Sequence, residues 1–220
     1  MTKNTFALPM LLALVGGCAQ APYWTLTDND NRVLKSTSFE MTVPAGWTRT
    51  TTADTWEQVK VDDKPQTLLL EQVTASRDGV GIQAITVTRR YPDTAFPTLK
   101  KKASASMQPF EVADLYVSEL RKRYGLERLR VVSNKPVQIS GKQGFELVME
   151  FKNDDGLRIR IVSNGFVDKT GFYTINYRAP VLYFYDRDYA DYSKLVRSFR
   201  QSKGAFDPPP EIPGWAKLFT

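Results

Sequence analysis

Strict alternation of apolar and polar residues marks the beginning of a globular region in this chain. In Phe39-Glu40-Met41-Thr42-Val43 the apolar side chains fall on one face of a β-strand, and a second strand is expected from Trp47. Runs rich in apolar and β-branched residues predict further strands at 66–74, 82–89, 129–139, 144–152, 157–167 and 171–178, with clear alternation in 144–152 and 157–167. Turn residues between some of these strands, such as Asn153-Asp154-Asp155-Gly156, predict hairpins.

Two other segments repeat their apolar residues at steps of three and four, the spacing of an amphipathic helix. The first stripe consists of Phe110, Ala113, Val117, Leu120 and Tyr124, and Gly125 follows it as an expected C-cap. The second consists of Tyr185, Tyr189, Tyr192, Val196 and Phe199. Aromatic residues in a helical stripe usually pack in a core, which is the favoured interpretation of the three tyrosines. A ligand cleft between their helix and the sheet is the alternative.

Two local pairings can also be predicted. The apolar segments Trp24-Thr25-Leu26-Thr27 and Val33-Leu34 flank a polar run, so they are expected to form a small hairpin. Aligning the apolar faces across the turn at 153–156 places Glu150 opposite Arg158 or Arg160, depending on the loop register. On a solvated face such an ion pair contributes a few tenths of a kcal/mol.

The first seventeen residues have the features of a secretory signal. Lys3 precedes a mostly apolar run from Phe6 to Val15, and small residues follow. The run is about half of the roughly 20 residues that span a bilayer. The only cysteine of the chain, Cys18, comes directly after Gly17.

The segment Val15-Gly16-Gly17-Cys18 resembles the lipobox of bacterial lipoproteins. The resemblance implies cleavage before Cys18, which then carries a diacylglycerol and an N-acyl chain, enough for stable anchoring to a membrane. Ala19 stands where Asp would retain a Gram-negative lipoprotein in the inner membrane, so the outer membrane, facing the periplasm, is expected if the source is Gram-negative. An ordinary signal peptide with a chance cysteine is the alternative.

These features divide the chain into a signal peptide at 1–17, a lipidated N-terminus and tether at 18–36, one domain at 37–201 and a proline-rich tail at 202–220. The tail contains Pro208-Pro209-Pro210, which favours an extended segment. Trp215 and Phe219 in the tail either fold back onto the domain or contact a partner.

Composition excludes several kinds of catalytic and metal site. The chain has 220 residues with no His and one Cys, which excludes Ser-His-Asp and Cys-His catalysis, His-ligated or Cys-rich metal sites and intrachain disulfides. The net charge of +6 is scattered in small groups without a recognition motif, so no nucleic-acid partner is expected. We therefore predict no cofactor, no metal and no catalytic residue.

Two motifs that suggest ligand binding have simpler interpretations. Residues 79–84 match the glycine pattern of a dinucleotide site, but they lead into a predicted strand instead of a helix, so a hairpin is favoured. The acidic run at 28–31 lacks the later Gly and Glu of a calcium loop and is interpreted as a polar turn. Carboxylates on predicted strands, Glu71, Glu146 and Glu150, leave a hydrolase as a weaker alternative.

The order of these elements resembles the PsbP-like (Mog-type) superfamily, including its DcrB-like bacterial lipoproteins. The similarity lies in Val43-Pro44 with Gly46-Trp47, in Val137-Gln138-Ile139 with Gly141, and in Tyr177, Ala179-Pro180 and a helix closing on Ser198-Phe199-Arg200. The resemblance implies an α+β fold, an α/β/α sandwich whose mainly antiparallel sheet of about six to seven strands carries helices on both faces. It also implies a binding or assembly role, since PsbP supports the photosystem manganese cluster and the Mog protein binds a small GTPase. None of those partner sites is recognisable here.

Together these observations favour a non-catalytic, lipid-anchored protein of the cell envelope that binds a protein partner or supports an envelope assembly. A carrier of a small ligand or lipid, using a cleft beside Tyr185, Tyr189 and Tyr192, is the alternative. A deep cavity would favour the carrier, whereas a filled core with an exposed aromatic patch would favour partner binding.

Overall fold

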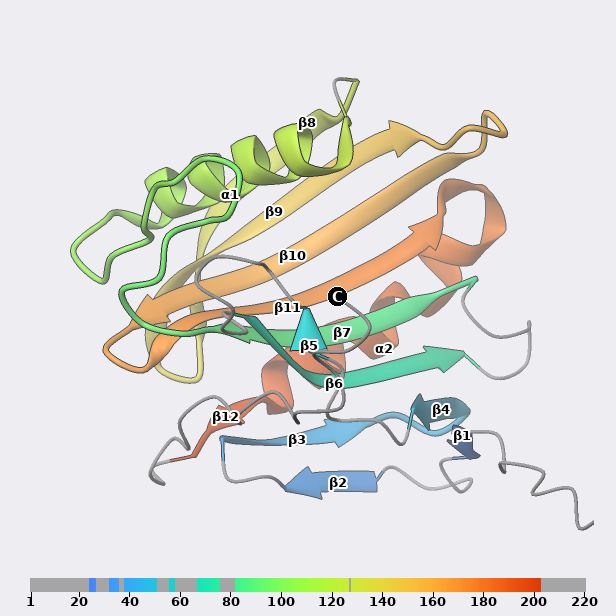
Figure 1. The fold of residues 1–220 in the computed structure, drawn as a ribbon. Helices are drawn as coiled ribbons and strands as arrows, with labels where there is room; N and C mark the ends of the chain where they lie inside the picture. Colours follow the sequence, from blue (N-terminus) through green and yellow to red (C-terminus); the bar gives the residue numbers. More distant parts are fainter. Residues whose placement is uncertain are drawn as a thin grey trace, which may run out of the picture.

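A long antiparallel sheet runs through the domain (Figure 1). The structure is a computed structural model that describes residues 24–26, 32–35, 38–50, 56–57, 67–75, 82–126 and 128–202. The strand order is β1 (Trp24–Leu26), β4 (Trp47–Thr50), β6 (Thr67–Ala75), β7 (Ala84–Arg90), β11 (Gly171–Pro180), β10 (Arg158–Asp168), β9 (Lys142–Lys152), β8 (Arg130–Ile139), and β5 (Trp56–Glu57) also pairs with β6.

One helix packs on each face of this sheet. Helix α1 (Pro109–Tyr124) lies over β8, β9 and β10, and α2 (Asp186–Ser198) lies on the opposite face (Figure 1). Gly125 caps α1 in the left-handed conformation, as expected. The predicted α+β class, with an antiparallel sheet and helices on both faces, is confirmed, although the sheet has more strands than expected.

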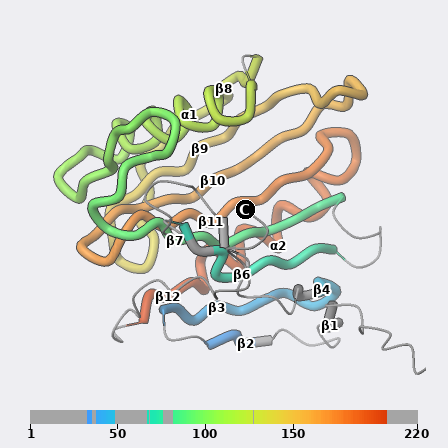
Figure 2. Tube along the Cα trace, in the orientation of Figure 1, coloured from blue at the N-terminus to red at the C-terminus, as the bar shows by residue number. Residues whose placement is uncertain are grey.

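A second sheet, which the sequence did not predict, joins the two ends of the domain. Its order is β12 (Arg200–Gln201), β3 (Phe39–Val43) and β2 (Arg32–Lys35), so the blue and red ends of the tube meet in Figure 2. The Phe39 and Phe199 rings stack with centroids 5.8 Å apart, and the Thr42 amide donates to Ser198 Oγ at 2.9 Å. Residues close to both ends of the described domain are therefore part of its core.

The alternation of side chains along the strands produces a hydrophobic cluster on each face of the long sheet. On β11, for example, Phe172 points to the α1 side and Tyr173 to the α2 side. The α2-side cluster includes Trp47, Tyr177, Tyr192 and Phe199, while the α1-side cluster includes Phe96, Phe145, Leu147 and Met149.

Two local predictions from the sequence were wrong. Strands β1 and β2 do not form a hairpin, because β1 pairs with β4 and β2 pairs with β3, in different sheets. Phe110 and Tyr124 do not line the buried face of α1, since Phe110 is 59% exposed and Tyr124 is also exposed. Val112 and Leu115 are among the α1 side chains that are buried instead.

Glu150 pairs across the sheet with Arg160, one of the two predicted partners, but its face is not solvated as expected. The carboxylate is buried and accepts hydrogen bonds from Arg160 Nε at 2.7 Å and from Arg130 Nη2 at 3.0 Å. Burial opposes its ionisation, yet the hydrogen bonds from the two arginines outweigh burial and lower the pKa of Glu150.

The tyrosines packed between α2 and the sheet predict a loss of stability at alkaline pH. Burial raises the pKa of Tyr185 to about 12 and also raises the pKa of Tyr177 and Tyr192. These phenols ionise near pH 10 in the unfolded chain, which above that pH binds fewer protons than the folded state. The free energy of unfolding should therefore fall as the pH rises from about 10 to about 12.

Urea unfolding at a series of pH values, followed by circular dichroism, would measure this fall. The Tyr192→Phe variant should show a shallower pH dependence, because it lacks one buried phenol. A stability that does not change between pH 9 and pH 11.5 would contradict the prediction.

Candidate functional site

Helix α1 covers only part of its face of the sheet. It packs on β8, β9 and β10, so α1-side positions on β6, β7 and β11 lie beyond it. These positions are mostly polar: Thr86, Thr88 and Arg90 on β7, and Thr174 and Asn176 on β11. A change from apolar to polar residues on the same face therefore coincides with the edge of the helix.

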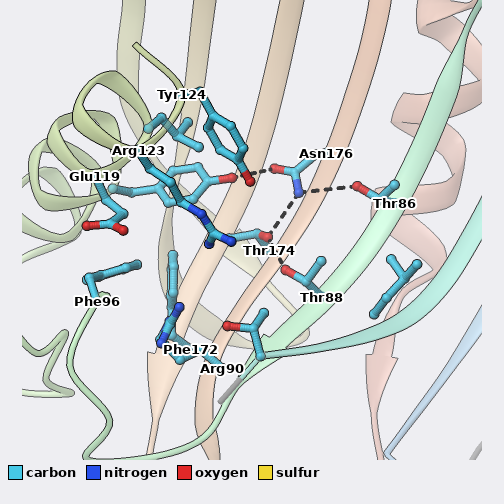
Figure 3. Close-up of a pocket in the computed structure, with 14 residues that line it drawn as sticks. Thr86, Thr88, Arg90, Phe96, Glu119, Arg123, Tyr124, Phe172, Thr174 and Asn176 are labelled. Atoms are coloured by element: carbon cyan, nitrogen blue, oxygen red, sulfur yellow. Dashed lines mark hydrogen bonds between the residues drawn. The ribbon is translucent and has the colours of Figure 1, made fainter. Parts of the chain in front are cut away.

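A cleft of about 420 Å³ lies between α1 and this polar part of the sheet (Figure 3). Ligand sites of proteins typically have volumes of about 300–1,000 Å³. The side chains of the helix that line the cleft are Tyr116, Glu119, Leu120, Arg123 and Tyr124. Phe96, Phe172 and Leu69 contribute apolar surface.

The floor of the cleft is a preformed hydrogen-bond network. Asn176 Nδ2 donates to Thr174 Oγ1 at 3.0 Å and to Thr86 Oγ1 at 3.4 Å, and its Oδ1 accepts from Tyr116 OH at 3.3 Å. The hydroxyls of Thr88 and Thr174 lie 2.6 Å apart (Figure 3). The network connects α1 to β7 and β11 and fixes the orientation of these polar groups.

Thr67 adds a hydroxyl that the protein does not satisfy. Its side chain lines the cleft, the residue is only 8% exposed, and its Oγ1 has no hydrogen-bond partner within the described residues. A buried hydroxyl without a partner costs about 1–3 kcal/mol, so such groups are uncommon in native proteins. A bound molecule in the cleft would supply the missing partner.

Three charged side chains line the cleft. The Arg90 guanidinium lies over the Phe96 ring at 5.0 Å and donates to the Ala95 carbonyl at 3.1 Å, while that of Arg123 lies over the Tyr124 ring at 5.2 Å. The carboxylate of Glu119 accepts two hydrogen bonds from the backbone: Oε1 from the Thr98 amide at 3.1 Å and Oε2 from the Leu99 amide at 2.9 Å. Among the described residues, the lining therefore has two positively charged side chains and one negatively charged side chain.

An exposed apolar loop between β11 and α2 is a second candidate surface. Leu182 is 80% exposed and Tyr183 is 67% exposed. The backbone of Tyr183 has φ +70°, a value that residues other than glycine rarely adopt. The Arg187 guanidinium lies over the Tyr183 ring, 4.8 Å from its centroid. Backbone strain of this kind often accompanies binding surfaces.

The structure places the three tyrosines of the predicted ligand cleft in the α2-side cluster. The Tyr192 hydroxyl donates to Asn164 Oδ1 at 2.6 Å, and its ring stacks on Tyr177. Tyr185 and Tyr189 stack on each other with centroids 5.5 Å apart. The cleft described above is lined by α1, on the other face of the sheet. Cys18, Val15, Gly16, Gly17, Trp215 and Phe219 lie outside the described residues.

The described residues contain neither a metal-binding cluster nor a membrane-spanning helix. Among the described residues, no three His, Cys, Asp or Glu side chains come close enough together to hold a metal ion. No helix in that part of the chain is both long and apolar enough to cross a bilayer. Of the strand carboxylates considered for hydrolysis, Glu150 is held between Arg130 and Arg160.

No family model and no curated protein matches the sequence. Among solved structures, cyanobacterial PsbP (CyanoP) from Synechocystis sp. PCC 6803 matches with a TM-score of 0.51 at 10% identity, over 85% of this chain and 98% of that chain. The domain has a PsbP-like fold.

Two weaker matches to this PsbP-like domain follow. A variant of the protein Mog1 has a TM-score of 0.46 at 14% identity, over 77% of this chain and 95% of that one. LpqN of Mycobacterium tuberculosis, described as involved in cell envelope biogenesis, has a TM-score of 0.34 at 10% identity, over 81% and 83%. At these identities the matches concern the fold, so the function of the PsbP-like domain must be argued from its own residues.

The cleft of the PsbP-like domain was not predicted from the sequence. Its polar floor lies on β7 and β11, where the sequence predicts strands at 82–89 and 171–178 without indicating a site. One signal was available: Thr86, Thr88, Thr174 and Asn176 occupy alternate positions, and a polar face on two strands predicts that no helix covers it.

Proposed function

We propose that this protein is a non-catalytic, lipid-anchored binding protein of the bacterial cell envelope whose cleft between α1 and the sheet binds a small molecule. The lipobox-like segment ending in Cys18 supports the anchor. The observation that carries the binding role is the cleft, with its preformed polar floor and the hydroxyl of Thr67, which has no partner among the described residues. The composition, without His and with one Cys, supports a role without catalysis.

An experiment on the Cys18→Ala variant tests both parts of this proposal. Wild-type protein should sediment with membranes. The variant, exported with an ordinary signal peptide whose cleavage does not need the cysteine, has no acyl chains and should leave the membrane fraction. Native mass spectrometry of the variant, purified without detergent, should detect a small molecule bound to the protein. The double variant Cys18→Ala with Thr86→Phe has a phenyl ring on the cleft floor. This ring should prevent the small molecule from binding, so its adduct should be absent from the mass spectrum.

A matched control shows whether loss of the bound molecule in native mass spectrometry is specific to a change in the cleft. Ser106→Phe adds the same ring at an exposed position outside the cleft and should retain the adduct. Equal adducts in the Thr86→Phe and Ser106→Phe proteins would contradict binding in the cleft. Membrane association that does not depend on Cys18 would contradict the lipid anchor.

A second candidate function, the binding of a partner protein, is supported by the loop at Leu182 and Tyr183. Exposed apolar residues on a strained loop form the kind of surface that other proteins contact. Crosslinking in intact cells, compared between wild type and a variant with Leu182→Ser and Tyr183→Ser, would identify a partner that depends on this loop. Identical crosslinks in both would argue against it.

A further inference from the structure

The charged side chains that line the cleft indicate whether its ligand is an anion or a cation. This inference rests on the function proposed above, the binding of a small molecule in the cleft. Both oxygens of Glu119 already accept backbone N–H groups, so its carboxylate is committed to holding the 98–99 backbone against α1. Arg90 and Arg123 provide two positive charges in the same lining. The described part of the lining therefore presents a ligand with more positive than negative charge.

The two guanidinium groups are also held in defined positions. Arg90 lies over Phe96 and Arg123 lies over Tyr124, so a cation–π contact holds each guanidinium against a ring. In Figure 3, Arg123 reaches from α1 towards the threonine row of the floor. A planar guanidinium matches the two oxygens of a carboxylate or phosphate, which favours an anionic group.

The remaining walls favour an apolar part of the ligand. Leu69, Leu120, Phe172 and Tyr116 line the same space, and the hydroxyls of the floor are largely engaged with one another. We propose that the cleft binds a small amphipathic anion, a carboxylate or phosphate joined to an apolar chain. The anionic group binds near Arg123, and Thr67 Oγ1 donates a hydrogen bond to the ligand.

Calorimetric titration of the soluble chain 18–220 with Cys18→Ala, which contains every described residue, tests the proposal. The probes are decanoate, decyl phosphate and neutral 1-decanol at neutral pH. We expect at least one anion to bind about tenfold more tightly than decanol. If decanoate binds and decyl phosphate does not, the anionic group of the ligand is a carboxylate. If only decyl phosphate binds, it is a phosphate.

Two variants locate the anion. Arg123→Gln should weaken binding of the anion about tenfold and leave decanol unchanged. Lys122→Gln removes the same charge from the exposed neighbouring position of α1 and should have little effect. Thr67→Val deletes the unpartnered hydroxyl at nearly constant volume and should weaken anion binding without lowering stability.

The possible failures are distinguishable. Equal binding of decanol and both anions would overturn the anionic class and leave the binding function intact. Equal losses in the Arg123→Gln and Lys122→Gln proteins would overturn the assignment of the anion to the cleft. If none of the probes binds and native mass spectrometry finds no adduct, both this inference and the proposed function fail.

Discussion

The Phe145→Ala substitution should lower the free energy of unfolding by about 3–5 kcal/mol, the range for removing a buried phenyl ring. Phe145 is fully buried beneath α1, where its ring contacts those of Tyr116 and Phe172. It also covers Gly165 of the neighbouring strand: a Cβ on that glycine would lie 2.5 Å from Cζ of Phe145. The ring thus fills a space that the backbone leaves open, and alanine leaves a cavity there.

Urea unfolding of both proteins gives the difference directly, and a helical phenylalanine provides the control. Phe110 belongs to α1 but is largely exposed, so Phe110→Ala should change the free energy of unfolding by at most about 0.5 kcal/mol. Similar losses for the two substitutions would mean that α1 is rotated relative to the arrangement described above.

The Asp188→Ala substitution should cost about 3 kcal/mol, because it removes a buried carboxylate that two side chains hydrogen-bond. Asp188 lies in the first turn of α2 and is 1% exposed. Its Oδ2 accepts hydrogen bonds from Gln83 Nε2 at 3.0 Å and from Arg187 Nη2 at 2.7 Å. Gln83 directly precedes β7, so the carboxylate joins the beginning of α2 to the sheet.

Asp186 offers a closely matched control for this substitution. It lies in the same first turn of α2 and has the same favourable interaction with the helix dipole, but it is exposed. Asp186→Ala should therefore cost about 0.5 kcal/mol, as measured by thermal and urea unfolding. If the two variants lost equal stability, the helix dipole and not the buried network would explain the effect of Asp188.

The sequence predicted those elements whose pattern repeats locally. Strand β3 was predicted with its observed bounds, Phe39–Val43, and the strands from β8 to β11 within about two residues at each end, because alternation is a property of neighbouring residues. The cross-strand pair of Glu150 and Arg160 followed from the register of one hairpin.

Pairings between distant segments could not be predicted in the same way. Trp24–Leu26 pairs with Trp47–Thr50, well beyond the neighbouring segment Arg32–Lys35, which pairs instead with the next strand, Phe39–Val43. Phe110 was misplaced because apolar spacing indicates a helix without showing which apolar residue the sheet covers. The cleft depends on how far α1 extends across the sheet, which no local pattern records.

Pairing between the two ends of the domain also has a consequence for biosynthesis. Strand β3 hydrogen-bonds to β12, and the Ser202 amide donates to the Ser38 carbonyl at 3.0 Å, so the small sheet closes contacts between residues more than 150 positions apart. Such contacts form late, because loop closure must precede them. A ribosome-bound chain therefore cannot complete the domain before residue 202 emerges, and until then it stays incompletely folded.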